Sequence, residues 1–111
     1  MTTIFGKIVR GELPADKVYE DETILAFKDI NPIAPVHILI IPKKEIPDLQ
    51  SLAAEDAHLV SSMVQVAQQL AKEFGLDEGY RLITNNGNDA GQEVQHLHFH
   101  LVGGRKLGRM G

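Results

Sequence analysis

The feature that most constrains this chain is a strict alternation of histidine and apolar residues near its C-terminus. His96, His98 and His100 alternate with leucine and phenylalanine up to residue 102. Successive side chains of a β-strand point to opposite faces of its sheet, so the pattern predicts a strand over residues 94–102. One face packs on a core, and the other carries three imidazoles in a row. A slip of one residue would exchange the two faces, so the register is strongly specified.

Apolar periodicity predicts the other elements. Apolar residues at helical spacing between residues 52 and 74 predict a long amphipathic helix, and residues 3–10 form a short one. Runs of β-branched and apolar residues predict four further strands, over residues 18–20, 24–27, 36–41 and 80–84. Because the strands meet through short turns, we expect an α+β domain with a five-stranded antiparallel sheet.

Length and composition narrow the class of protein. The chain has 111 residues, of which 43% are hydrophobic, so it can bury one modest core. The formal net charge of −4 argues against general nucleic-acid binding, which needs a basic surface. Cysteine is absent, which excludes thiolate chemistry and fits a reducing compartment. No apolar run resembles a membrane span or a secretory signal, so we expect a cytoplasmic protein without a membrane partner.

Spacing alone leaves three interpretations of the histidine row open. The first is a solvated strand face, although lysine, glutamate and threonine usually dominate such faces. The second is a metal site, since imidazole is a common zinc ligand. The outer histidines lie about 13 Å apart along a strand, so an ion would bind two of them and a further ligand such as His37. The third is nucleophilic catalysis at phosphorus, because a neutral imidazole can form a covalent intermediate.

Several single residues carry weaker signals. His37 either orients the other histidines or is a core histidine with one hydrogen bond. Asp29, at a strand end, either caps a turn or binds a hydroxyl group. Gly91 and Gln92 offer close backbone approach and an amide donor just before the histidine strand. His58 lies off the apolar face of the long helix, so we expect it to be exposed.

The run from His96 to Val102 matches the histidine-triad motif, and further blocks extend the match. The chain resembles the histidine triad (HIT) nucleotide-binding proteins, specifically their Hint branch. The resemblance spans almost the whole chain. The other matching blocks are IFGKI (4–8), FKDINP (27–32), APVHILIIPK (34–43), GYRL (79–82), GQE (91–93) and GGR (103–105).

The resemblance implies a fold and an activity. It implies a HIT domain over residues 1–104, a C-terminal tail over residues 105–111, and a homodimer whose two sheets join into ten strands. It implies hydrolysis of the P–N bond of purine nucleoside phosphoramidates, such as AMP joined to an amine. His98 would attack the α-phosphorus and carry the nucleotide. His96 and His37 would orient His98, and His100 would contact the phosphate or protonate the leaving group.

The resemblance also implies a nucleotide site that needs no metal or other cofactor. Zinc, if it binds, would not be catalytic. Asp29 would hold the ribose hydroxyls. Some relatives carry serine where this chain has Glu93, and an ionised carboxylate cannot donate a hydrogen bond. The base would lie in an apolar slot formed by Ile4, Phe5, Ile8, Leu13, Phe27 and Ile30, and Asn85, Gly91, Gln92 and Glu93 would line the phosphate site.

Two other functions remain as alternatives to the phosphoramidase. One is a dinucleoside polyphosphate hydrolase of the same superfamily, against which the blocks upstream of the triad argue. The other is a nucleotide-binding regulatory module whose hydrolysis is incidental. The complete set of His37, His96, His98 and His100 counts against this module, because one replacement would be enough to end catalysis.

Overall fold

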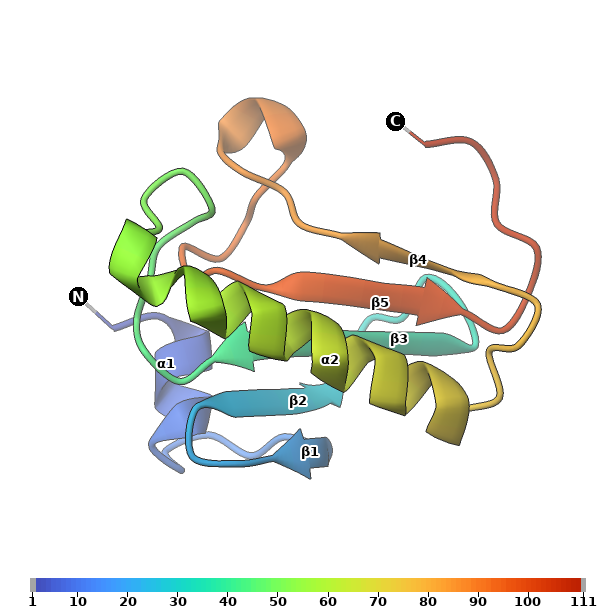
Figure 1. Ribbon diagram of the computed structural model, residues 1–111, viewed down its shortest axis with the longest axis horizontal. Coiled ribbons are helices and arrows are strands. Elements are labelled where there is room, and N and C mark those ends of the chain that lie inside the picture. The colour runs from blue at the N-terminus through green and yellow to red at the C-terminus, as the bar shows by residue number, and fades with distance from the viewer. Residues whose placement is uncertain (1, 111) are drawn as a thin grey trace.

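A single antiparallel sheet organises the protein in the computed structural model, which describes residues 2–110 (Figure 1). The strands lie in the order β1-β2-β3-β5-β4, and each neighbouring pair is antiparallel. The predicted α+β fold with a five-stranded antiparallel sheet is thereby confirmed. Met1 and Gly111, the outer ends of the expected domain and tail, lie outside the described residues. The strands are β1 (Lys17–Glu20), β2 (Ile24–Lys28), β3 (Val36–Pro42), β4 (Tyr80–Ile83) and β5 (Phe99–Gly103).

The long helix α2 (Ala57–Glu73) covers one face of the sheet. It begins five residues later than the apolar spacing predicts, after the 3-10 turn η1 (Ala54–Asp56). Leu52 packs against the same core from the irregular segment before this turn, so its spacing imitates helical periodicity. The buried helix residues Leu59, Met63, Val66 and Leu70 form one apolar cluster with Ile24, Ile38, Ile40, Leu97, Phe99 and Leu101.

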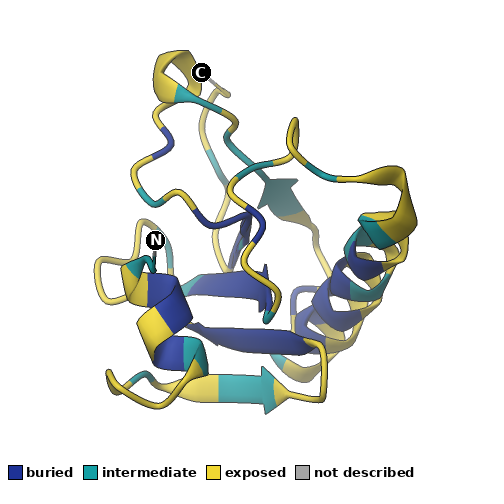
Figure 2. Cartoon of the chain, turned by 90° about the vertical axis from the view of Figure 1, so that its left-hand side faces the viewer, coloured by how far each residue is buried: buried dark blue, intermediate teal, exposed yellow. Residues whose placement is uncertain are grey.

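The opposite face is covered less completely. The short helix α1 (Ile4–Val9) packs there, and the Thr3 side chain accepts a hydrogen bond from the Gly6 amide at its N-terminus. Figure 2 shows α1 and α2 on opposite sides of the sheet. The six residues of α1 span only about 9 Å, so much of this face is left to loops. Its smaller apolar cluster comprises Phe5, Ile8, Leu25, Phe27, Leu39 and Ile41.

The histidine-bearing strand is shorter than predicted. Regular pairing starts at Phe99, whereas the expectation was a strand from residue 94. The Leu97 amide donates to the Ile46 carbonyl, and the Thr84 hydroxyl donates to the His98 carbonyl. These partners lie in loops, so the backbone before Phe99 leaves the sheet ladder. The predicted alternation survives, because Leu97, Phe99 and Leu101 all belong to the cluster under α2.

Within residues 2–110, none of the helices combines the length and the apolar character required to cross a bilayer.

Candidate active site

A cavity of about 620 Å³ opens on the face of the sheet that α1 covers only in part. All eleven residues expected at a nucleotide site line it, together with His37, His98 and His100. His96 lies beneath the cavity wall rather than in it. The cavity has an apolar wall, which we define as Ile4, Phe5, Ile8, Leu13 and Phe27, and a polar wall, which we define as Asn85, Gly91, Gln92 and Glu93.

The two walls come from opposite sides of β5. The apolar wall belongs to α1, the segment after it and β2, whereas the polar wall belongs to the connection between β4 and β5. In Figure 1, α1 lies below β5 and this connection, drawn in orange, lies above it. The histidines near the start of β5 therefore lie between an apolar side and a polar side of the same cavity.

The histidine row is buried rather than solvated. His96 is 1% exposed and His98 6%, and His100 is only partly exposed, so the interpretation as a solvated strand face is wrong. The ring of Phe5 packs edge to face against His98 and His96, with centroid distances of 5.0 Å and 6.2 Å. His58, in contrast, is exposed, as expected from its place on the long helix.

The hydrogen bond of His98 determines which of its nitrogens carries the proton. Nδ1 lies 2.6 Å from the carbonyl oxygen of His96. A carbonyl only accepts, so Nδ1 carries the hydrogen and the neutral ring keeps a free lone pair on Nε2. Burial lowers the pKa of His98 below its usual value, although the backbone hydrogen bond to His96 opposes this. His98 is therefore a neutral imidazole at pH 7, with a nucleophilic nitrogen beside the cavity.

His96 connects the segment before β5 to the end of β3. Its Nε2 donates to the carbonyl oxygen of Pro42 over 2.8 Å, which leaves a lone pair on Nδ1. Among the described residues this buried Nδ1 has no hydrogen-bond partner. Burial is the largest influence on the pKa of His96 and lowers it. The ring is thus held neutral and in one orientation, and the backbone carbonyl of the same residue positions His98.

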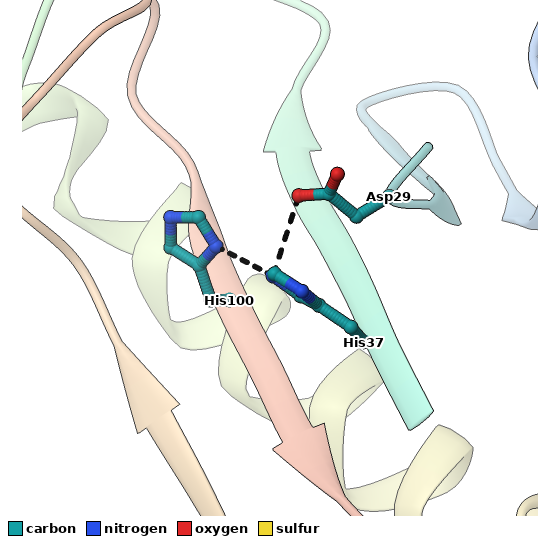
Figure 3. Close-up of side chains that lie close together, drawn as sticks. All are labelled: Asp29, His37 and His100. Carbon is teal, nitrogen blue, oxygen red and sulfur yellow. Dashed lines mark hydrogen bonds and ion pairs between the residues drawn. The ribbon is translucent and has the colours of Figure 1, made fainter. Parts of the chain in front are cut away.

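His37 and His100 form a second imidazole arrangement with Asp29 (Figure 3). The Ile33 amide donates to Nδ1 of His37 over 3.2 Å, so the neutral ring carries its hydrogen on Nε2. This Nε2 lies 2.9 Å from Nδ1 of His100 and 3.4 Å from Oδ2 of Asp29. The shorter contact identifies His100 as the acceptor, which places the hydrogen of the neutral His100 ring on its own Nε2.

The same burial keeps this pair uncharged. Burial lowers the pKa of His37, and the Asp29 carboxylate opposes the change. Burial, and then the neighbouring His98 and His37 rings, lower the pKa of His100 to about 4. At pH 7 the cavity therefore presents neutral imidazoles, which can attack and donate hydrogen bonds without the repulsion that a row of cations would create.

Comparisons with known proteins identify the family of this chain. The HIT domain family matches residues 10–107. The chain belongs to the HIT family. A purine nucleoside phosphoramidase from Escherichia coli K12 is 50% identical to this HIT protein over 109 residues, which is 97% of this chain and 92% of that protein. An uncharacterised HIT-like protein from Chlamydia muridarum is also 50% identical, over 97% of this chain and 86% of its own length.

Solved structures of HIT proteins have the same fold. A HIT family hydrolase from Clostridium thermocellum superposes with a TM-score of 0.94 at 46% identity, covering 98% of this chain and 96% of that one. A histidine triad protein from Clostridium difficile superposes with a TM-score of 0.93 at 48% identity, covering 97% and 95%. The expected HIT-like fold of the Hint-like branch is thereby confirmed.

The polar wall of this HIT protein is held by Gln92. Its Nε2 donates to the carbonyls of Pro47 and Val94, and its Oε1 accepts from the Gly87 amide. Both amide hydrogens are thus used within the protein, so Gln92 fixes the loop instead of offering the expected donor to a ligand. Gly91 ends the 3-10 turn η2 (Asn88–Ala90) at φ +83°, a conformation that favours glycine.

A metal ion has one set of candidate ligands among the described residues. Oxygen and nitrogen atoms of Asp29, His37 and His100 lie within 4.8 Å of one another, and zinc accepts such ligands. This set contains one triad histidine, whereas the spacing had suggested two together with His37. A bound ion would need the lone pairs of both His37 Nε2 and His100 Nδ1. Binding would therefore replace the hydrogen bond between these two nitrogens. These residues therefore fit a metal only by giving up a contact that they already make.

The residue patterns did not single out several further residues that line the cavity. Three of them are near Asp29 and Ile30 in sequence, namely Lys28, Asn31 and Ile33. Lys28 and Asn31 belong to the FKDINP block, so the block could have indicated them. Pro14, Ala15 and Val94 lie beside predicted residues in the same way. Leu39 shares the face of β3 that carries His37, because residues two apart on a strand point the same way.

Proposed function

We propose that this HIT protein hydrolyses the P–N bond of purine nucleoside 5′-phosphoramidates. The observation that carries the proposal is the hydrogen bond from Nδ1 of His98 to the His96 carbonyl. It leaves the lone pair of Nε2 free beside a cavity that has one apolar and one polar wall. The name of the Escherichia coli relative, purine nucleoside phosphoramidase, points to the same substrate class.

The first step forms a covalent intermediate. The Nε2 lone pair of His98 attacks the α-phosphorus, and the P–N bond breaks as its electron pair moves to the departing nitrogen. That nitrogen takes a proton through the Nε2–H of His100, which regains one from water. The amine leaves, and the nucleotide stays on a positively charged imidazole whose Nδ1–H still donates to the His96 carbonyl.

The second step releases the nucleotide. Water attacks the phosphorus, and the bond from phosphorus to His98 Nε2 breaks, so the electron pair returns to the imidazole. The attacking water gives up one proton, which balances the proton consumed in the first step. The products are the nucleoside monophosphate and the neutral His98 from which the cycle began.

The cavity supports binding of the rest of the substrate. The faces of a purine fit the apolar wall, where the Phe5 and Phe27 rings meet edge to face with centroids 5.5 Å apart. Asp29 lies at the end of the cavity near His37, and its carboxylate can accept hydrogen bonds from two ribose hydroxyls. We therefore assign the base to the apolar wall and the ribose to Asp29.

We further propose that this chemistry needs no metal, acts in the cytoplasm and belongs to a homodimer. The hydrogen-bond donors of the neutral histidines supply the electrostatic stabilisation, and the cysteine-free chain fits a reducing compartment.

Strand β4 lies at an edge of the sheet and its Tyr80 is 43% exposed, so two copies can join there into ten strands. Sedimentation analysis should give twice the chain mass of 12.2 kDa.

A rapid-quench experiment tests the proposed function. The protein is mixed with adenosine 5′-phosphoramidate, and the quenched peptides are sequenced by mass spectrometry. We expect one AMP on His98 during turnover, and a higher rate with the phosphoramidate than with diadenosine polyphosphates. Faster cleavage of diadenosine polyphosphates would favour the other hydrolase. Nucleotide binding without a trapped intermediate or product would favour the regulatory module.

A further inference from the structure

The two walls of the cavity assign a position to the leaving group. If the nucleoside occupies the apolar wall and the phosphorus lies at His98, the substituent on the departing nitrogen has only the polar side left to occupy. That side comes from the connection between β4 and β5, and Glu93 is the ionisable residue of the polar wall. The leaving amine is therefore placed on the side of the cavity that Glu93 lines.

The loop holds Glu93 in a defined place. Its neighbour Gln92 is 6% exposed and makes three hydrogen bonds, to Pro47, Val94 and Gly87. The backbone amide of Gln92 also donates to the Gly87 carbonyl. Glu93 follows this anchored residue in the chain and lines the cavity, and its side chain remains exposed to solvent.

Among the described residues, the charge of Glu93 has no partner of opposite charge. Within residues 2–110, no side-chain cation lies within 4 Å of a Glu93 carboxylate oxygen, and every ion pair involves another carboxylate. Lys28, the one lysine or arginine among the cavity residues, lies 3.7 Å from Asp16 instead. The cavity histidines are neutral, so the anionic phosphoramidate would approach an uncompensated carboxylate.

We propose that Glu93 is a specificity-determining residue, which selects leaving amines that carry a second, cationic group. Such a substituent, of the diamine or lysine side-chain class, would pair with the Glu93 carboxylate, which forms no ion pair within residues 2–110. An anionic substituent, such as that of an amino acid joined through its amino group, would be repelled by it. This inference rests on the proposed function, because it concerns the amine that this reaction releases.

Three substrates that differ only in terminal charge test the proposal. Each is an AMP phosphoramidate of a primary amine with three methylene groups, ending in an ammonium, a methyl or a carboxylate group. We measure kcat/KM for each and compare ratios between substrates, so that any general effect on the phosphate site cancels. For the wild type we expect the ammonium substrate to exceed the methyl substrate by about five-fold, as one partly solvated ion pair allows. The carboxylate substrate should be slower by a similar factor.

Substitutions at Glu93 should change these ratios in a defined order. Glu93→Gln keeps the shape and removes the charge, so the ammonium-to-methyl ratio should fall to about one. Glu93→Lys should invert the preference toward the carboxylate substrate. Glu22→Gln removes the same charge from an exposed residue outside the cavity, and its ratios should equal those of the wild type. Raising the salt concentration should reduce the wild-type preference, because exposed ion pairs are screened.

The outcomes separate this inference from the proposed function. If the wild type cleaves the methyl substrate but Glu93→Gln keeps the wild-type ratio, the inference about Glu93 fails and the phosphoramidase proposal stands. If the folded wild type cleaves none of the three substrates, the phosphoramidase proposal fails and the inference fails with it. Circular dichroism of each variant confirms that the ratios describe folded protein.

Discussion

The two faces of the sheet show how one set of strands serves two purposes. The face under α2 is apolar throughout, and its cluster extends from β2 across β3 and β5 to the helix. The face under α1 has a smaller apolar cluster, and it buries His37 and His98 beside a cavity. A long amphipathic helix therefore completes the packing on one face. On the other, a six-residue helix and a loop leave room for a ligand. This contrast predicts that stability and activity respond to substitutions on different faces.

The largest expected effect is on the cavity face. His98→Ala should reduce phosphoramidate turnover by about 10⁴-fold, because it removes the attacking nitrogen. His98→Asn keeps a donor for the His96 carbonyl and should lose a similar factor, which separates the loss from misfolding. Steady-state kinetics and chemical denaturation measure the two effects. Turnover near the wild-type rate in both variants would contradict the assigned nucleophile.

The next effect belongs to the α2 face. Leu70 is fully buried under the sheet, so Leu70→Ala should lower the free energy of unfolding by about 3 kcal/mol, from lost burial and a residual cavity. The kcat of the folded fraction should change less than about two-fold, because the helix does not line the ligand cavity. Val64→Ala, on the exposed side of α2, is the control and should cost under about 1 kcal/mol. Equal losses in both variants would show that α2 does not depend on this packing.

The third prediction concerns pH. The pKa values of His37, His96, His98 and His100 are lowered by burial, so below pH 6.5 the unfolded chain binds more protons than the folded one. Stability is therefore complete above pH 6.5 and falls as the pH drops toward about 4. From His100 alone, whose pKa falls to about 4, we expect a loss of about 2 kcal/mol between pH 7 and pH 5, measured by denaturation in guanidinium.

Two variants assign this pH dependence to the cavity face. His100→Asn should flatten the slope, because it removes the histidine whose pKa falls to about 4. His58→Asn, on the exposed surface of α2, should keep the wild-type slope. A slope that changes with His58 instead would move the cause from the buried histidines to the surface.

The smallest expected effect is that of metal removal. Treatment with a chelator should change kcat/KM by less than about two-fold, since the proposed steps use imidazoles and no ion. Added zinc should compete with the hydrogen bond between His37 and His100, so excess zinc is expected to inhibit rather than activate. Loss of activity after chelation, with recovery on adding zinc, would make the Asp29 cluster a metal centre.

The sequence predicted correctly those features that depend on neighbouring residues, and less well those that depend on residues distant in the chain. β3 and the histidine alternation were predicted correctly, because they depend on neighbours along the chain. The start of β5 was predicted too early, because Ile46 and Thr84, distant in sequence, provide the hydrogen bonds that take Leu97 and His98 out of the ladder. The convergence of Asp29, His37 and His100 depends on strand order, which the residue patterns did not specify.

The hydrogen bond from His98 to the carbonyl of His96 has an evolutionary consequence. The proposed nucleophile is oriented by a backbone carbonyl only two residues away, so its orientation is encoded within three consecutive residues. The walls to which we assign the base and the leaving group come from other parts of the chain, in α1, β2 and the connection before β5. Mutations can therefore alter the substrate range while the reactive nitrogen keeps its orientation, and one ancestral reaction can supply descendants that accept different amines.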